Sequence, residues 1–265
     1  MTYVSELETS RHVADRVYAC FDNRKNGDFT PYVLRSDDRG ATWTSIAGDL
    51  SPRDICYSVV EDHVNPDLLF IGTEFGCYGT IDGGKRWLRV SGVPTIAVRD
   101  LEIQRRENDL VMATFGRGFY IVDDYSPWRH ASEELLDKPV HVFPIKAALS
   151  YVQGARMGGG RGWSGATYFA APNPTFGAVI TYWLKDKVTS RKERRKESEK
   201  KDDWTYPTID EFRAEDRELE PRVVATIRDS SGAVVRRMSV PRDSGVHRIA
   251  WDLRHHDTSP VWGSD

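Results

Sequence analysis

The chain has 265 residues, of which 39% are hydrophobic and 29% charged, and its formal net charge is −3. This composition suits one large or two medium globular domains, and the slightly negative charge gives no electrostatic reason to expect binding to nucleic acid or a membrane surface. No apolar run approaches the roughly 20 residues of a membrane span, and residues 1–6 lack the apolar core of a signal peptide.

Residues 1–126 predict short antiparallel strands that recur in groups. Each group holds short apolar or alternating segments separated by turn residues, which is the pattern of a four-stranded propeller blade. Strands are expected at 4–8, 16–21, 32–35 and 43–46, then at 56–61, 68–73, 77–80 and 87–90, and finally at 98–103, 109–114 and 119–124. A structural unit repeated at this spacing indicates a propeller or a similar array.

Two copies of one turn motif stand between the third and fourth expected strands of the first two groups. Their aspartates, Asp38 and Asp82, are 44 residues apart. The hydroxyl and carboxylate side chains can bond to nearby backbone groups, and the glycine supplies a positive φ. These residues are therefore predicted to build turns. The motif residues are Ser36, Asp38, Gly40, Thr42 and Trp43 in the first copy, and Thr80, Asp82, Gly84 and Trp87 in the second.

Both segments resemble the Asp-box (BNR) repeat of the β-propellers in sialidases, sortilin/VPS10 domains and xyloglucanase-type glycosidases. The first copy matches in full, whereas the second has Arg86 where the pattern prefers Ser or Thr. In that family the box lies on a hairpin turn at the rim of a blade, away from the central ligand site. The resemblance therefore implies a structural role for both aspartates.

A third segment, residues 108–124, resembles the last blade of large bacterial sortilin-like BNR-repeat proteins, which are often labelled glycosyl hydrolases. It carries the same kind of Gly-Arg-Gly-aromatic sequence around Arg117. Arg117 is either a residue at the propeller mouth or a solvated turn arginine, and the second interpretation is preferred. The resemblance also implies a secreted or periplasmic protein.

Three blades are fewer than the four to eight of a closed propeller, and open blades leave unpaired strand edges. Repeats need neighbours to bury a continuous core. We therefore expect the chain to be a C-terminal fragment that lacks upstream blades of the same polypeptide. Closure with other chains is the alternative.

The second half of the chain divides into a connector, residues 127–170, and a β-sandwich, residues 171–265. The Gly-rich segment 157–162 lacks the GKS or GKT ending of a phosphate-binding loop and is interpreted as a linker. Residues 185–220 are a charged insertion, expected to be a solvated helix or a disordered excursion. Tight turns between short strands favour a partial immunoglobulin-like sandwich. Its strands are expected at 177–184, 222–229, 233–238 and 245–253.

Candidate catalytic residues cannot be selected from the sequence. It has no HExxH, Walker or GxSxG motif, and no cofactor or metal is expected. The adjacent His255 and His256 would point to opposite sides of a strand, so a surface loop is preferred over a metal pair. Three cysteines without a CxxC pair are expected to be buried thiols. These cysteines are Cys20, Cys56 and Cys77.

Glycosidases use two carboxylates that flank the sugar bond. Asp62, Glu74 and Asp100 are candidates for the propeller mouth, although their spacing does not distinguish them from other acidic residues. Two functions remain open. One is a module that binds a protein, a peptide or a glycan. The alternative is a glycoside hydrolase whose catalytic carboxylates lie largely outside this sequence.

Overall fold

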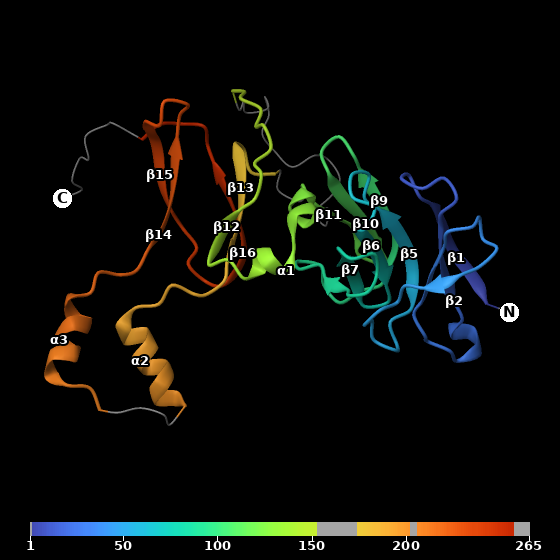
Figure 1. The fold of residues 1–265 in the computed structure, drawn as a ribbon, viewed down its shortest axis with the longest axis horizontal. Helices are drawn as coiled ribbons and strands as arrows, with labels where there is room; N and C mark the ends of the chain where they lie inside the picture. The colour runs from blue at the N-terminus through green and yellow to red at the C-terminus, as the bar shows by residue number, and fades with distance from the viewer. Residues whose placement is uncertain (1, 153–173, 202–205, 257–265) are drawn as a thin grey trace, which may run out of the picture. The chain divides into compact units, whose positions relative to one another are not determined.

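The computed structural model describes residues 2–152, 174–201 and 206–256. The chain forms two compact units, residues 1–132 and 133–265 (Figure 1). Both units are built mainly from antiparallel sheets, so the chain is an all-β protein. In the described residues, no helix combines the length and the apolar character needed to cross a membrane.

The first unit is a partial β-propeller of three antiparallel sheets. In each sheet, strands that follow one another in the chain lie side by side, which confirms the predicted blades. The first sheet holds β1 (Tyr3–Thr9), β2 (Val17–Asp22), β3 (Tyr32–Ser36) and β4 (Thr44–Ser45). The second holds β5 (Cys56–Glu61), β6 (Leu69–Thr73), β7 (Gly76–Thr80) and β8 (Leu88–Arg89). The third holds β9 (Val98–Gln104), β10 (Asp109–Thr114) and β11 (Gly118–Val122).

The fourth strands, β4 and β8, have two residues each and are shorter than predicted. The reason is local, because the turns before them extend to Trp43 and Trp87. In the second copy, the backbone N–H of Trp87 donates to the Asp49 carboxylate at 2.7 Å instead of to a neighbouring strand.

The second sheet is buried between its two neighbours. In β6, Leu69 and Ile71 pack toward the first sheet, while Phe70 packs toward the third. This alternation follows from the period of two in a strand. Gly72 permits the close approach of the third sheet, since a Cβ there would lie 2.5 Å from Ser58 Oγ and 2.7 Å from the carbonyl oxygen of Val98. The three cysteines are buried as free thiols in these two cores, as predicted.

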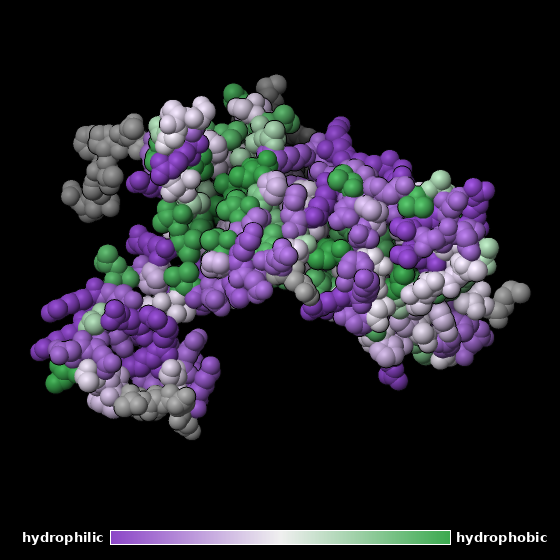
Figure 2. Space-filling model, in the orientation of Figure 1, coloured by the Kyte–Doolittle hydropathy of each residue, from purple (hydrophilic) through white to green (hydrophobic). Residues whose placement is uncertain are grey.

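The second unit is a partial sandwich. A three-stranded sheet is ordered β12-β13-β16, and a hairpin of β14 and β15 forms the other layer. Their shared core contains Tyr182, Leu184 and Val240. Figure 2 shows apolar side chains gathered over this part of the unit. The strands are β12 (Val140–Val142), β13 (Ala178–Leu184), β14 (Val223–Arg228), β15 (Val234–Val240) and β16 (Gly245–Trp251).

The described part of the charged insertion forms two helices, α2 (Arg191–Lys200) and α3 (Ile209–Arg217), which lie side by side (Figure 1). Each helix begins with a reciprocal capping box, which satisfies backbone N–H groups of its first turn. Arg195 of α2 binds Glu215 of α3 through two N–H groups, at 2.8 and 3.0 Å. Cross-pairing of opposite charges therefore holds this polar insertion together.

Short helical segments complete the described structure: the 3-10 turns η1 (Arg24–Asn26) and η2 (Ser126–His130), and α1 (Glu133–Leu136). The Gly-rich segment 157–162 and Asp257, which follows the two histidines, lie outside the described residues.

Candidate functional site

The first strand of each sheet in the propeller unit carries a β-bulge. In β1 the register passes from Val4 to Glu6 and leaves Ser5 unpaired. The same irregularity leaves Tyr57 unpaired in β5 and Arg99 unpaired in β9. A bulge re-aims a side chain and is common beside functional sites. Three neighbouring strands therefore present one re-aimed side chain each.

The three bulged residues line one cavity, which we call the bulge cavity. Its volume is about 420 Å³, and its other walls are Tyr3 and residues 22–26, which run from the end of β2 through η1. This volume lies in the range of small-molecule sites, about 300–1,000 Å³. Ser5 Oγ is buried there, and no described residue forms a hydrogen bond with it. The cavity thus combines ligand-sized space with an unused hydrogen-bonding group.

Tyr57 is the centre of the polar contacts beside this cavity. Arg24 Nη1 donates a hydrogen bond to the Tyr57 hydroxyl at 3.0 Å, and that hydroxyl donates to the carboxylate of Glu74. Burial, and then the Glu74 carboxylate, raise the pKa of Tyr57 to about 12. The phenol is therefore protonated at neutral pH and acts as a hydrogen-bond donor rather than as a nucleophile.

Arg99 lies over the ring of Tyr57, with its guanidinium carbon 3.9 Å from the ring centroid. Stacking of this kind is a favourable cation–π contact and fixes the plane of the guanidinium group. Among the described residues, no carboxylate forms an ion pair with Arg99. Its N–H groups are therefore oriented but remain available to a ligand.

An adjoining cavity of about 430 Å³ shares Arg24 with the bulge cavity. Its lining is more apolar and includes Phe29, Ile55 and Phe75, together with Arg53 and Glu74. Glu74, a mouth candidate from the sequence, therefore lies between the Tyr57 hydroxyl and this second cavity.

The other mouth candidates lie elsewhere. Arg117 is exposed on the turn between β10 and β11, at the end of the third sheet where β9 begins, and lines neither cavity. Asp100 follows Arg99 on β9 and accepts a hydrogen bond from the backbone N–H of Leu101. Asp62 follows the last residue of β5 and so lies at the opposite end of that strand from Tyr57. Its proposed place at the same mouth as Glu74 is wrong.

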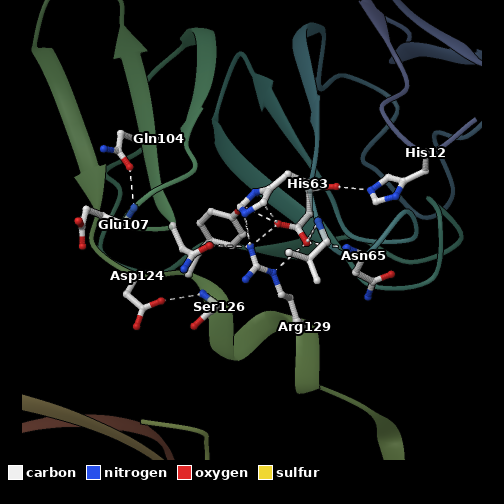
Figure 3. Close-up of polar contacts among 12 residues, drawn as sticks. His12, His63, Asn65, Gln104, Glu107, Asp124, Ser126 and Arg129 are labelled. Atoms are coloured by element: carbon white, nitrogen blue, oxygen red, sulfur yellow. Dashed lines mark hydrogen bonds and ion pairs between the residues drawn. The ribbon is translucent and has the colours of Figure 1, made fainter. Parts of the chain in front are cut away.

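Asp62 is fully buried and belongs to a closed polar network (Figure 3). Arg129 donates two hydrogen bonds to its carboxylate, at 2.9 and 2.7 Å, and Tyr125 donates one at 2.5 Å. The backbone N–H groups of Val64 and Asn65 complete the set. Burial raises the pKa of Asp62, but the bonds from Arg129 and Tyr125 outweigh it and lower the pKa below its ordinary value. This carboxylate is therefore ionised at neutral pH, and its bonds to Arg129 and Tyr125 anchor η2.

The first turn motif is a compact set of local bonds. Gly40 N donates to Ser36 Oγ at 2.8 Å, and Thr42 donates to Asp38 through its backbone N–H at 2.8 Å and its hydroxyl at 2.6 Å. Trp43 donates its ring N–H to the Gly40 carbonyl oxygen at 3.0 Å. Bonds from Thr42, and then from Ser36, lower the pKa of Asp38 to about 2.

The second turn motif reaches beyond its own sheet. Asp82 accepts the backbone N–H groups of Lys85 and Arg86 at 2.9 and 3.1 Å. Trp87 is buried and donates its ring N–H to the carbonyl oxygen of Ile46 at 2.9 Å, which ties the second sheet to the first. Gly84 has a φ of 96° and lies against Ile46, where a Cβ would come within 2.8 Å. The Trp43 bond of the first copy therefore lies within its own turn, whereas the Trp87 bond of the second copy joins two sheets.

Glu6 is an acid next to the bulge at Ser5. It accepts the backbone N–H of Val59 at 3.1 Å and so bridges β1 and β5. Burial and the nearby carboxylates of Asp100, Glu8 and Glu102 raise its pKa to about 7, against the opposing effect of the Val59 bond. In the described residues, no group of three or more His, Cys, Asp or Glu side chains could hold a metal ion.

The sequence did not single out Arg24, Tyr57 or Arg99. A usable signal was present for two of them, because Tyr57 and Arg99 occupy matching places in consecutive repeats, at the start of an expected first strand. Arg24 lies in an inserted loop with no counterpart in the other sheets. Only the fold brings it to Tyr57.

No protein-family model matches the sequence, and no curated protein matches it. Solved structures with partial likeness include an ancestral GH74 enzyme, with 20% identity and a TM-score of 0.36 over 43% of this chain and 14% of that chain. A GH74 xyloglucanase from Xanthomonas campestris has 16% identity and a TM-score of 0.36 over 46% and 21%. The GH74 enzyme from Niastella koreensis has 13% identity and a TM-score of 0.36 over 46% and 29%. The similarity spans less than a third of each of these proteins and assigns no activity to this chain.

Proposed function

We propose that this chain is a ligand-binding module of a larger, secreted or periplasmic sortilin-like BNR-repeat protein, and that it binds a glycan in the bulge cavity. The observation that carries the proposal is the convergence of Ser5, Tyr57 and Arg99, each the bulged residue of its strand, on one cavity. A packing role alone would not require three bulges that all open toward solvent-accessible space.

A glycan suits the lining better than an apolar peptide does. Hydroxyl, amide, carboxylate and guanidinium groups surround the bulge cavity, and sugar hydroxyls both donate and accept hydrogen bonds. Tyr3 is 67% exposed at the rim and offers an aromatic face. The adjoining cavity, with Glu74 at its edge, extends the surface for a longer chain.

Hydrolysis is the alternative function, and the contacts favour binding. A glycosidase needs one carboxyl group to protonate the leaving oxygen and a second to act on the sugar or on water. Asp22 is bound to Arg24 at 3.2 Å, and Glu74 is bound to Tyr57. Among the described residues, the two carboxylates that line the cavities are thus both engaged within the fold, and a hydrolase would need catalytic carboxylates from outside this sequence.

We further propose that Asp38 and Asp82 have a structural role, together with the Ser, Thr, Gly and Trp residues of their turns. They bond to the backbone of the same turn and lie at the opposite end of their sheets from the bulge cavity. Arg117 is proposed to be a solvated turn residue.

The test is a glycan array probed with the full chain, followed by calorimetry on the best binder. We expect binding that is lost in Tyr57→Ala and kept in Asp38→Ala. Binding of peptides with no binding of any glycan would contradict the proposal, as would hydrolysis of a bound oligosaccharide.

A further inference from the structure

The bulge cavity has an excess of positive charge. Arg24, Lys25 and Arg99 line it, and Asp22 is its one lining carboxylate among the described residues. Asp22 is already engaged, since it accepts the Arg24 backbone N–H at 2.9 Å and pairs with its guanidinium at 3.2 Å. Within the described part of the chain, no ion pair or hydrogen bond engages Lys25 or Arg99. Two cations therefore face the cavity without an internal counter-ion.

The geometry of Arg99 suits an anionic group on a ligand. Its guanidinium is stacked on Tyr57, and the Tyr57 ring is held in turn by bonds of its hydroxyl to Arg24 and Glu74. Such an arginine loses little rotamer freedom when it binds, and its planar fork matches a carboxylate. Lys25, on the loop across the cavity, adds a second positive charge.

The other lining groups suit the uncharged part of a sugar. Ser5 lines the cavity, and its buried Oγ, which has no hydrogen-bond partner among the described residues, can bond a sugar hydroxyl after a change of rotamer turns it toward the cavity. Asn26 donates its side-chain N–H to Asn23 at 2.6 Å, and Asn23 donates to Asp28 at 2.8 Å, so the loop is internally braced. These bonds fix the loop that carries Lys25 before any ligand arrives.

We propose that the glycan bound in the bulge cavity is acidic, and that a sugar carboxylate of the uronic acid type binds Arg99 and Lys25 while a neighbouring hydroxyl bonds Ser5. This inference rests on the proposed function and names the ligand class of the same site. It predicts that acidic glycans dominate the binders and that binding weakens with salt, because the charges are partly exposed.

The experiment begins with an array of neutral, carboxylated and sulfated oligosaccharides probed with the full chain. The best carboxylated binder is then compared with its methyl ester by calorimetry. We expect at least a tenfold loss of affinity on esterification. Arg99→Gln and Lys25→Gln should each weaken binding of the acid by about tenfold and leave binding of the ester unchanged. Arg117→Gln makes the same charge change at the same end of the sheets, outside the cavity, and should alter affinity less than twofold.

The outcomes separate the two proposals. Binding of neutral glycans alone, or equal binding of acid and ester, overturns the acidic ligand and leaves glycan binding in place. Preference for sulfated glycans without carboxylates overturns the uronate assignment. No binding to any glycan overturns both. Thermal melts of Arg99→Gln and Lys25→Gln test whether these variants are folded. An equal loss of affinity for the acidic glycan in Arg117→Gln would show a general effect of charge and would contradict the proposed site.

Discussion

The two ends of β5 carry the same kinds of side chain in opposite arrangements. At one end Asp62, Arg129 and Tyr125 form a closed, buried set in which the arginine is bidentate to the carboxylate (Figure 3). At the other end, about 16 Å away by strand rise, Arg99 stacks on the ring of Tyr57, and no described residue accepts a hydrogen bond from its N–H groups. Arg129 stabilises the fold because its N–H groups bond to a buried carboxylate. The guanidinium plane of Arg99 is fixed by stacking alone, so its N–H groups can bind a ligand.

The largest loss of stability is expected from a substitution that breaks the buried network of Asp62. Asp62→Ala leaves Arg129, whose side chain is 12% exposed, without its counter-ion. Removing one partner of a buried ion pair costs about 3–5 kcal/mol, so the free energy of unfolding should fall by that amount in urea titrations. Asp15→Ala is the control, since it breaks an ion pair to an arginine that is 79% exposed, and it should cost less than about 1 kcal/mol. Equal losses would show that the Asp62 network is not a special anchor.

The second effect concerns the two turn motifs, which lie at the same end of the sheets as Asp62. Asp82→Ala should destabilise the protein by about 1–2 kcal/mol, because it frees two backbone N–H groups beside the contact of Trp87 with Ile46. Asp38→Ala should cost less, since Trp43 is 38% exposed and donates its ring N–H to Gly40 within the same turn. Urea titrations of both variants decide this order. A larger loss for Asp38→Ala would contradict the bridging role of the second copy.

The third effect is a pH dependence from Glu6. Its folded pKa of about 7 lies above the unfolded value of about 4.3, so the folded state binds more protons between these pH values. Stability should therefore fall as pH rises through this window. Glu6→Gln should flatten that fall while it keeps an acceptor for the Val59 N–H. Unfolding free energies at pH 5, 6, 7 and 8 measure it, and an unchanged slope would contradict the assignment.

The smallest effect on stability is expected at the open end. Tyr57→Phe removes the hydroxyl between Arg24 and Glu74, which should cost about 0.5–1.5 kcal/mol because Arg24 is exposed and Glu74 is only partly buried. Glycan affinity should nevertheless fall, since Arg24 and Glu74 no longer hold the ring under Arg99. Calorimetry measures the glycan affinity and thermal melts measure the stability of the same sample. A large loss of stability with unchanged affinity would assign Tyr57 to the fold rather than to the site.

The sequence by itself determined the repeated strands and the two turns, because these depend on contacts between residues close in the chain. Hydroxyl, carboxylate and glycine within eight residues are enough to predict the bonds at Asp38, and the continuous apolar run at residues 68–71 is enough to predict β6. The shortness of β4 and the burial of Trp87 were not predictable, since both depend on how a turn meets its surroundings.

Only the tertiary structure decided which charged residues form a site. Asp62 and Glu74 look alike in the sequence, yet the direction of β5 places them at opposite ends of the second sheet. Tyr57 and Arg99 are bulged residues of the second and third sheets, and Arg24 reaches Tyr57 from a loop of the first. A bulge is a mismatch of one residue between two paired strands, and no pattern within a single strand records it. Local chemistry therefore predicted the blades, and long-range pairing placed the cavity.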